Sequence, residues 1–178
     1  GNTRLLETYR PISLLKTIYK IYARLLQTRI EAAVDDLIHP TQHGFRKHRG
    51  TRQAIHLVRR ILEQGESSQQ KTILVLLDWE KAFDKLTHKA LFIALEKMNI
   101  HEKLINLVKM IYKKPEFMAE TNGKQSSWKT QNSGIRQGCQ MSPYLFLIAM
   151  SAIICDIKHN QKTRQKLEKN TPKGADLD

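Results

Sequence analysis

The sequence predicts an α+β fold that is mostly helical and carries a small antiparallel sheet. Apolar residues recur every three to four positions in several segments, which is typical of helices that pack on one face. A continuous apolar run at 72–77 is typical of a buried strand, and Asn122-Gly123 inside the segment 117–131 indicates a hairpin turn. With 178 residues and 40% apolar content, the chain can bury one core, so we expect one domain or a large piece of one.

The first predicted helix covers the segment 14–30, where most lysines and arginines lie off the apolar face. Asp35-Asp36 and His39-Pro40 end it, since proline disfavours helical angles in the residue before it. The segment 43–50 then forms a loop that holds three lysines and arginines. The apolar face of the helix consists of Leu14, Leu15, Ile18, Ile21, Tyr22, Leu25, Leu26 and Ile30.

The second predicted helix begins at Thr51, whose hydroxyl can cap it. A polar loop at 65–70 separates this helix from the run 72–77, which we expect to be a central strand covered on both faces. Periodicity does not distinguish that run from a helix, but its brevity and the charged break at Asp78 favour a strand. The predicted core face of the second helix consists of Ala54, Leu57, Val58, Ile61 and Leu62.

The second half of the chain predicts three more helices and the hairpin. Thr87 begins one helix, and another runs from Leu104 to Ile111. The segment 144–157 is almost entirely apolar and longer than an ordinary strand, so we expect a buried helix. The segment 158–173 is polar and basic, which is typical of a connector.

Composition limits the classes of function. The net charge of +13 is spread along the chain and attracts polyphosphates, of which nucleic acid is the commonest. Binding to an anionic membrane, or a simple gain in solubility, would also explain such a charge. The two cysteines are too few for a disulfide framework or a zinc site, and the histidines lack the spacing of a metal site. Because the sequence has neither an apolar span nor a signal peptide, we expect an intracellular protein, with nucleus and cytoplasm both open.

Asp78 is the leading candidate for chemistry because it directly follows the predicted strand. A carboxylate there is costly to desolvate unless a cation or hydrogen-bond donors compensate it. Mg²⁺ is one such cation, and in nucleotidyl transfer it polarises the reacting phosphate. The alternative is that Asp78 pairs with Lys81 or caps the following turn.

Two residues close behind Asp78 are weaker candidates. Asp84 lies just before a predicted helix, where we expect it to cap or brace local backbone more than to bind metal. Phe83 is either a packing residue or the floor beneath a nucleotide's sugar. The sequence leaves both roles of Phe83 open.

The segment 134–143 combines two glycines with the amide of Gln137 and the cation of Arg136. Amide and guanidinium groups are suited to touching a base pair and a template backbone. Taken by itself, the segment is also typical of an ordinary junction between a loop and a helix.

Five segments in order resemble the reverse transcriptases of non-LTR (LINE-type) retrotransposons and, more distantly, those of group II introns. The segments are Tyr9 to Leu15, Gln42 to Lys47, Asp78 to Asp84, Asn132 to Pro143 and Tyr144 to Phe146. The resemblance covers the chain from about residue 8 onward. It implies the fingers and the first half of the palm of a right-hand polymerase, with a fingers-like segment at 1–71, a partial palm at 72–157 and a basic connector at 158–178.

The resemblance also implies a role for each matching residue. Asp78 matches the catalytic, metal-binding aspartate of the palm, with Mg²⁺ as the cofactor or Mn²⁺ in its place. Phe83 matches the aromatic gate against a 2′-hydroxyl, and Gln137, Gly138 and Arg46 match nucleotide-binding positions. The positions implied to contact nucleic acid are Arg10, Lys47, Arg49 and Arg136.

The implied activity is RNA-directed DNA synthesis, with an RNA template, a DNA primer and deoxynucleoside triphosphates as partners and with no membrane. In the family, a Tyr/Phe-x-Asp-Asp strand and a thumb follow a segment like 172–178, and this sequence contains neither the motif nor a thumb. Two-metal catalysis needs that second source of carboxylates, so we expect this chain alone to be inactive. The alternative is a non-catalytic, basic RNA-binding module or a decayed retroelement.

Overall fold

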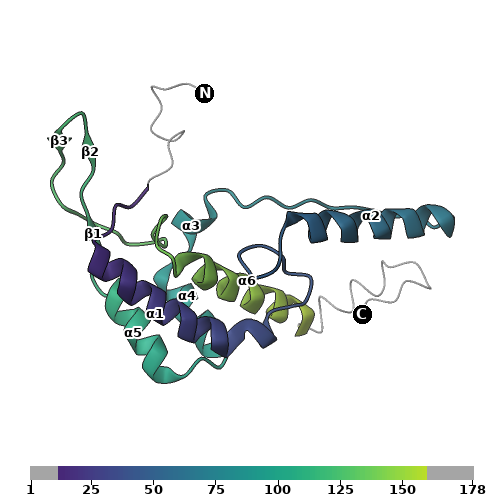
Figure 1. The fold of residues 1–178 in the computed structure, drawn as a ribbon, viewed down its shortest axis with the longest axis horizontal. Helices are drawn as coiled ribbons and strands as arrows, with labels where there is room; N and C mark the ends of the chain where they lie inside the picture. The colour runs from purple at the N-terminus through teal and green to yellow at the C-terminus, as the bar shows by residue number, and fades with distance from the viewer. Residues whose placement is uncertain (1–11, 160–178) are drawn as a thin grey trace.

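The computed structural model describes residues 12–159, and in that range the fold is mostly helical, as predicted (Figure 1). Four helices build the core: α1 (Thr17–Val34), α4 (His88–Lys97), α5 (Glu102–Tyr112) and α6 (Ser142–His159). Helix α6 packs against α4 and α1, and α5 packs against α4. A 3₁₀ turn, η2 (Asp35–Leu37), follows α1, so the helix ends just before Asp35-Asp36, where the sequence predicts its end.

Helix α6 is central because its sequence is apolar on nearly every side. Its apolar residues from Tyr144 to Ala149 are mostly buried, and α1 contributes a buried row that includes Leu26 and Ile30. The predicted helix at 144–157 is confirmed, but it is buried only as far as Ala152, since Ile153, Ile154 and Ile157 are exposed. The predicted start of α4 is also confirmed, since the hydroxyl of Thr87 accepts a hydrogen bond from the backbone N–H of Ala90 at 3.2 Å.

The predicted hairpin is confirmed and projects from the helical core (Figure 1). Its base pairs β1 (Glu116–Phe117) with β4 (Lys129–Thr130), and its tip pairs β2 (Glu120–Thr121) with β3 (Lys124–Gln125), both antiparallel. The two tip residues have left-handed backbone angles, with φ of 48° at Asn122 and 74° at Gly123. Asparagine and glycine tolerate these angles better than other residues, which explains the turn.

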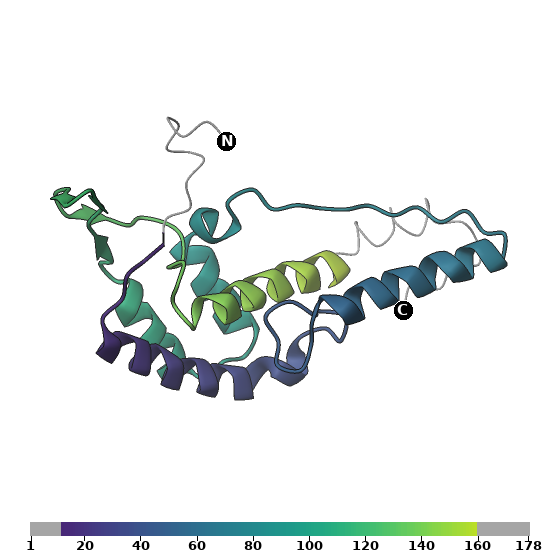
Figure 2. The same cartoon turned by 45° about the horizontal axis from the view of Figure 1, so that its top comes forward.

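The prediction of a central strand at 72–77 is wrong. The segment from Ile73 to Leu77 contains no strand, and its apolar side chains are 52–86% exposed. A strand is stable when neighbouring strands form hydrogen bonds with its backbone groups. Within residues 12–159, the paired strands all belong to the hairpin, so the segment at 72–77 has no neighbouring strand. The segment instead runs back beside α2 (Thr51–Ser67) toward the short helix α3 (Ala82–Lys85) (Figure 2).

The predicted burial of two helix faces also needs correction. Helix α2 forms, but Gly50 and not Thr51 is its N-cap, and the helix extends to Ser67 into the predicted loop at 65–70. Leu57, Val58, Ile61 and Leu62 of its apolar face are exposed. On α1, Leu26 and Ile30 are buried, whereas Ile18, Ile21, Tyr22 and Leu25 are exposed. Leu14 precedes α1, which begins only at Thr17, and is exposed as well. A helical period predicts an apolar face, but the tertiary arrangement decides what covers that face.

The core joins α1, from the predicted fingers-like segment, with α4 to α6, from the predicted partial palm. Because one core contains helices from both predicted segments, it does not mark a boundary between them, and the boundary at 71/72 stays a prediction. Most of the predicted connector at 158–178 lies outside the described residues, and Lys158 and His159 belong to α6. Among the helices of residues 12–159, none has the length and apolar character that a bilayer crossing requires.

Candidate active site

The turn from Gly134 to Gly138 is fixed to the chain around α3 by backbone hydrogen bonds. The N–H of Ile135 donates to the carbonyl of Phe83, and the N–H of Gly134 donates to the carbonyl of Leu86, both at 2.8 Å. Gly134 has a φ of 87°, and a Cβ there would lie 2.9 Å from the carbonyl oxygen of Asp84 and 3.0 Å from that of Phe83. This close approach of two backbones requires glycine.

The same turn is held from a second direction by the residues that precede α1. The N–H of Ser13 donates to the carbonyl of Gln137 at 2.8 Å. Gly138 has a φ of 102°, and a Cβ there would lie 3.1 Å from the carbonyl oxygen of Ser13. The turn is thus fixed between two segments that are distant from it in the sequence.

A side-chain contact links the two segments that the sequence identified separately. The amide nitrogen of Gln137 donates to the carboxylate of Asp84, at 3.0 Å from Oδ1 and 3.2 Å from Oδ2, and both side chains are half-buried. The hydroxyl of Ser133 donates to the backbone carbonyl of Asp84 at 3.2 Å. Asp84 therefore braces a segment about fifty residues away, whereas the sequence predicted a local brace.

Phe83 lies beside this contact and packs among aromatic rings from two other segments. Its ring centroid is 5.2 Å from that of Phe146 on α6, in an edge-to-face arrangement, and 6.1 Å from that of Phe45. Such arrangements favour a fixed ring orientation. The packing role is observed, and the role of Phe83 as a sugar gate stays a prediction.

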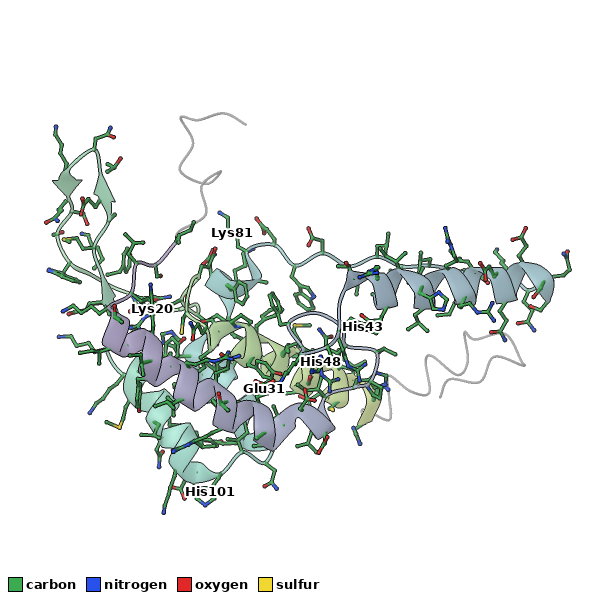
Figure 3. All side chains as sticks on the ribbon, in the orientation of Figure 1. Lys20, Glu31, His43, His48, Lys81 and His101 are labelled. Atoms are coloured by element: carbon green, nitrogen blue, oxygen red, sulfur yellow. The ribbon has the colours of Figure 1, made fainter. Side chains whose placement is uncertain are left out.

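Asp78 makes none of these contacts and is exposed on the segment that leads to the turn at Lys81. Figure 3 labels Lys81. The sequence offered an ion pair between Asp78 and Lys81 as the alternative role of Asp78. The ion pairs found within residues 12–159 do not include this pair. A carboxylate is the donor type that Mg²⁺ prefers, and one or two carboxylates hold this ion together with substrate phosphates and waters. No cluster of three or more histidine, cysteine or acidic residues occurs in the described range, so the residues seen there do not assemble a metal centre by themselves.

Arg46 is buried and contacts the end of α1. Its Nε donates to Asp35 Oδ1 at 3.0 Å, and its Nη2 donates to the carbonyl of Asp35 at 2.8 Å. Its Nη1 donates to the carbonyls of Ile38 and His39. The hydrogen bond from Arg46 holds the pKa of the Asp35 carboxyl below its ordinary value. The observed partners of Arg46 are protein groups, and its predicted contact with a nucleotide stays a prediction.

Arg136 also points into the protein. Its guanidinium lies 5.0 Å from the ring centre of Tyr19 and 5.8 Å from that of Tyr112, distances typical of cation–π contacts. Burial raises the pKa of Tyr112 to about 12. His88 supports the same turn, with its Nε2 2.9 Å from the carbonyl oxygen of Gly134.

Sequence reasoning missed Tyr19, Tyr112 and His88. An aromatic or histidine residue at a helical core position carries no signal that it will contact a distant turn. The predicted template contact of Arg136 stays a prediction, since its observed contacts are with these tyrosines.

The remaining predicted nucleic-acid contacts lie on or near the loop before α2. Lys47 and Arg49 are exposed there, close to His48 (Figure 3). A cavity of about 620 Å³ opens at the beginning of α2 and is lined mainly by basic and histidine side chains. Arg10 lies outside the described residues. The residues that line the cavity are His48, Arg49, Gly50, Thr51, Arg52, Gln53 and His56.

Comparisons with known proteins agree with this arrangement of motifs. The model of the family described as reverse transcriptase (RNA-dependent DNA polymerase) matches residues 2–169. The chain is 29% identical over 155 residues to the transposon TX1 uncharacterized 149 kDa protein of Xenopus laevis, which covers 87% of this chain and 12% of that protein.

Two further relatives come from insects. One is the RNA-directed DNA polymerase from mobile element jockey of Drosophila melanogaster, 29% identical over 82% of this chain and 16% of its own length. The other is the retrovirus-related Pol polyprotein from type-1 retrotransposable element R2 of Popillia japonica, 26% identical over 85% of this chain and 21% of its own length. The chain therefore spans about a fifth or less of these relatives.

Proposed function

We propose that this chain, which belongs to the reverse transcriptase (RNA-dependent DNA polymerase) family, supplies part of the nucleotidyl-transfer site of a retrotransposon's RNA-directed DNA polymerase. The observation that carries the proposal is the family match across residues 2–169. The docking of Phe83 and Asp84 against Gln137 supports it, because two separate motifs of the family then share one site. Relatives named as RNA-directed DNA polymerases support it further.

In this proposal the incoming deoxynucleoside triphosphate lies against Phe83 and the turn at Gln137 and Gly138. The ring of Phe83 is held by two other phenylalanines, so it can act as a fixed steric limit beneath a sugar. Gly138 is exposed, and the carbonyl of Ser13 occupies the side where its side chain would lie. The amide of Gln137 supplies a polar contact at the same place.

The reverse transcriptase family generally uses divalent metal ions. We propose Mg²⁺ here, or Mn²⁺ in its place, with Asp78 as one of its ligands. When bound, such an ion polarises the reacting phosphate and neutralises developing charge. Asp78 contributes the acidic oxygen, and its exposed position leaves that oxygen accessible to further ligands from outside residues 12–159.

An RNA template and a DNA primer are the proposed macromolecular partners. The net charge of +13 favours a polyphosphate, and the exposed Lys47 and Arg49 lie near a basic cavity. We include Arg10 in the same surface on the basis of the family motif alone. For Arg46 and Arg136, we propose that they act indirectly, by holding the fold behind the site.

The test is primer extension on an RNA template with the longest expressed form of the protein. Asp78→Asn should lower incorporation by about 100-fold or more while RNA affinity stays within about two-fold, because the change removes one ligand charge from the reaction and leaves the basic surface intact. Glu80→Gln is the matched control, since Glu80 is also an exposed carboxylate on the same segment. Incorporation should survive this change.

Undiminished synthesis by Asp78→Asn would remove Asp78 from the mechanism. Salt-sensitive RNA binding without incorporation, in every form tested, would instead favour a non-catalytic RNA-binding module.

A further inference from the structure

We propose that Asp84 is a positioning residue that fixes the orientation of the Gln137 carboxamide and so decides which of its two polar atoms meets a ligand. This inference rests on the proposed function for the identity of the ligand. Its geometric part, the orientation of the amide, stands on the contact between the two side chains.

The chemistry of the contact determines how the amide is turned. An ionised carboxylate only accepts hydrogen bonds, and a carboxamide has one donating end and one accepting end. The nitrogen of Gln137 must therefore face Asp84, as the distances of 3.0 and 3.2 Å to the two carboxylate oxygens indicate. The reversed amide would place its oxygen against two negatively charged oxygens, which is unfavourable in a half-buried site.

Backbone contacts hold both partners of this pair in place. The carbonyl of Gln137 accepts from Ser13, and the carbonyl of Asp84 accepts from Ser133. The two hydrogen bonds from Gly134 and Ile135 to the chain around α3 lie between them. Because neither backbone can move freely, the amide orientation depends on the side chain of Asp84.

The consequence is a preference in what the site accepts. With its nitrogen directed at Asp84, Gln137 turns its carbonyl oxygen, which is a hydrogen-bond acceptor, to the opposite side. A ligand on that side must then supply a donor, such as a hydroxyl or amino group of a nucleotide. Without Asp84, the amide can rotate and present either end, so discrimination weakens while the turn itself remains.

A charge exchange between the two positions tests the inference in the full chain. Asp84→Asn keeps the size of the side chain but allows either orientation of Gln137. Gln137→Glu keeps the acceptor but sets two carboxylates at hydrogen-bond distance, so we expect a clear fall in the urea midpoint. The double variant restores one donor and one acceptor, so its midpoint should return most of the way to that of the parent chain.

Nuclear magnetic resonance reads the amide directly. In the parent chain, the two side-chain amide protons of Gln137 should be well separated and shifted from the positions of a free glutamine, because the group is held by Asp84. In Asp84→Asn they should move toward the free positions. Ser133→Ala is the control, since it removes a contact to the backbone of Asp84 and leaves the carboxylate, so the Gln137 signals should change little.

The functional readout is the split between kcat and KM in primer extension, measured with the longest expressed form of the protein. Asp84→Asn should raise the KM for the nucleotide by about ten-fold, the equivalent of one hydrogen bond, and change kcat by less than about three-fold. Unchanged amide signals in Asp84→Asn, or no recovery in the double variant where the single variants fold, would overturn the positioning role. If the Gln137 amide signals behave as expected but the protein never binds nucleotide, the proposed function is overturned. The orientation of Gln137 by Asp84 would still hold.

Discussion

The helical core and the α2 arm, which we define as α2 with the extended segment 68–81, are built from similar apolar patterns with opposite outcomes. In the core, Leu91, Leu95 and Leu145 are completely buried. In the arm, Leu76 and Leu77 are at least 80% exposed. An apolar pattern thus predicts that a face favours burial, but the face is buried only where another part of the protein packs against it.

The candidate site lies where these two regions meet. Phe83 and Asp84 follow the arm after Ala82 and are fixed to the core through the turn at Gly134 to Gly138. Asp78 lies on the arm itself and shares none of those contacts. One part of the site is therefore held rigidly, and the acidic part is presented on an exposed segment.

The largest expected effect contrasts one leucine from each region. Leu145→Ala should lower the free energy of unfolding by about 3 kcal/mol, because it leaves a cavity at a side chain with no exposed area. Leu76→Ala should change it by less than about 0.5 kcal/mol, since Leu76 is 86% exposed. Urea unfolding followed by circular dichroism measures both, and equal losses would mean that the arm is buried in solution.

The second contrast concerns two glycines with positive φ. Gly134→Ala should destabilise the chain by about 2–3 kcal/mol, because it combines left-handed strain with displacement of the backbone at Phe83 and Asp84. Gly123→Ala should lose only about 1 kcal/mol, since nothing lies within 4 Å of its added Cβ. The same urea measurement compares them. A loss at Gly134 no larger than at Gly123 would contradict the close docking of the turn.

The smallest effect tests how the end of α1 is held. Arg46 holds the folded-state pKa of Asp35 below its ordinary value, so this stabilisation is fully present above the ordinary pKa and disappears as the pH falls through the folded-state pKa. Asp35→Asn should therefore lose about 1 kcal/mol at pH 7, a modest value because solvent screens the half-exposed Asp35. The difference should shrink toward zero at low pH. If the difference in unfolding free energy between the parent chain and Asp35→Asn is the same at pH 7 and at pH 3, the charge of Asp35 is not the cause of the lost stability.

The sequence predicted well where the signal is local. Thr87 caps the start of α4, Asn122-Gly123 makes the hairpin turn, and the apolar segment 144–157 is a helix that is buried as far as Ala152. Each of these depends on neighbouring residues and on backbone preferences that the residues carry with them. The motifs at Phe83 and Gln137 could also be identified, because their residue types are suited to contacting a nucleotide.

The errors occurred where the outcome depends on a distant partner. The run at 72–77 has the composition of a central strand, yet within residues 12–159 it has no strand beside it. The protein contacts of Arg46 and Arg136 were not predicted either: one holds the end of α1 and the other stacks on two tyrosines. Their nucleotide and template contacts stay predictions. The link from Asp84 to Gln137 was also missed, since pairing across fifty residues leaves no local pattern.

The most direct test of the central claim is a titration of the full chain with a deoxynucleoside triphosphate, followed by nuclear magnetic resonance. The account predicts the largest shift changes at the backbone amides of Phe83, Gln137 and Gly138, with little change at the hairpin tip around Gly123. Asp84→Asn should weaken the titration at the same amides. Shift changes that favour the hairpin or the arm, with none at the docked turn, would contradict the claim that these two motifs form one nucleotide site.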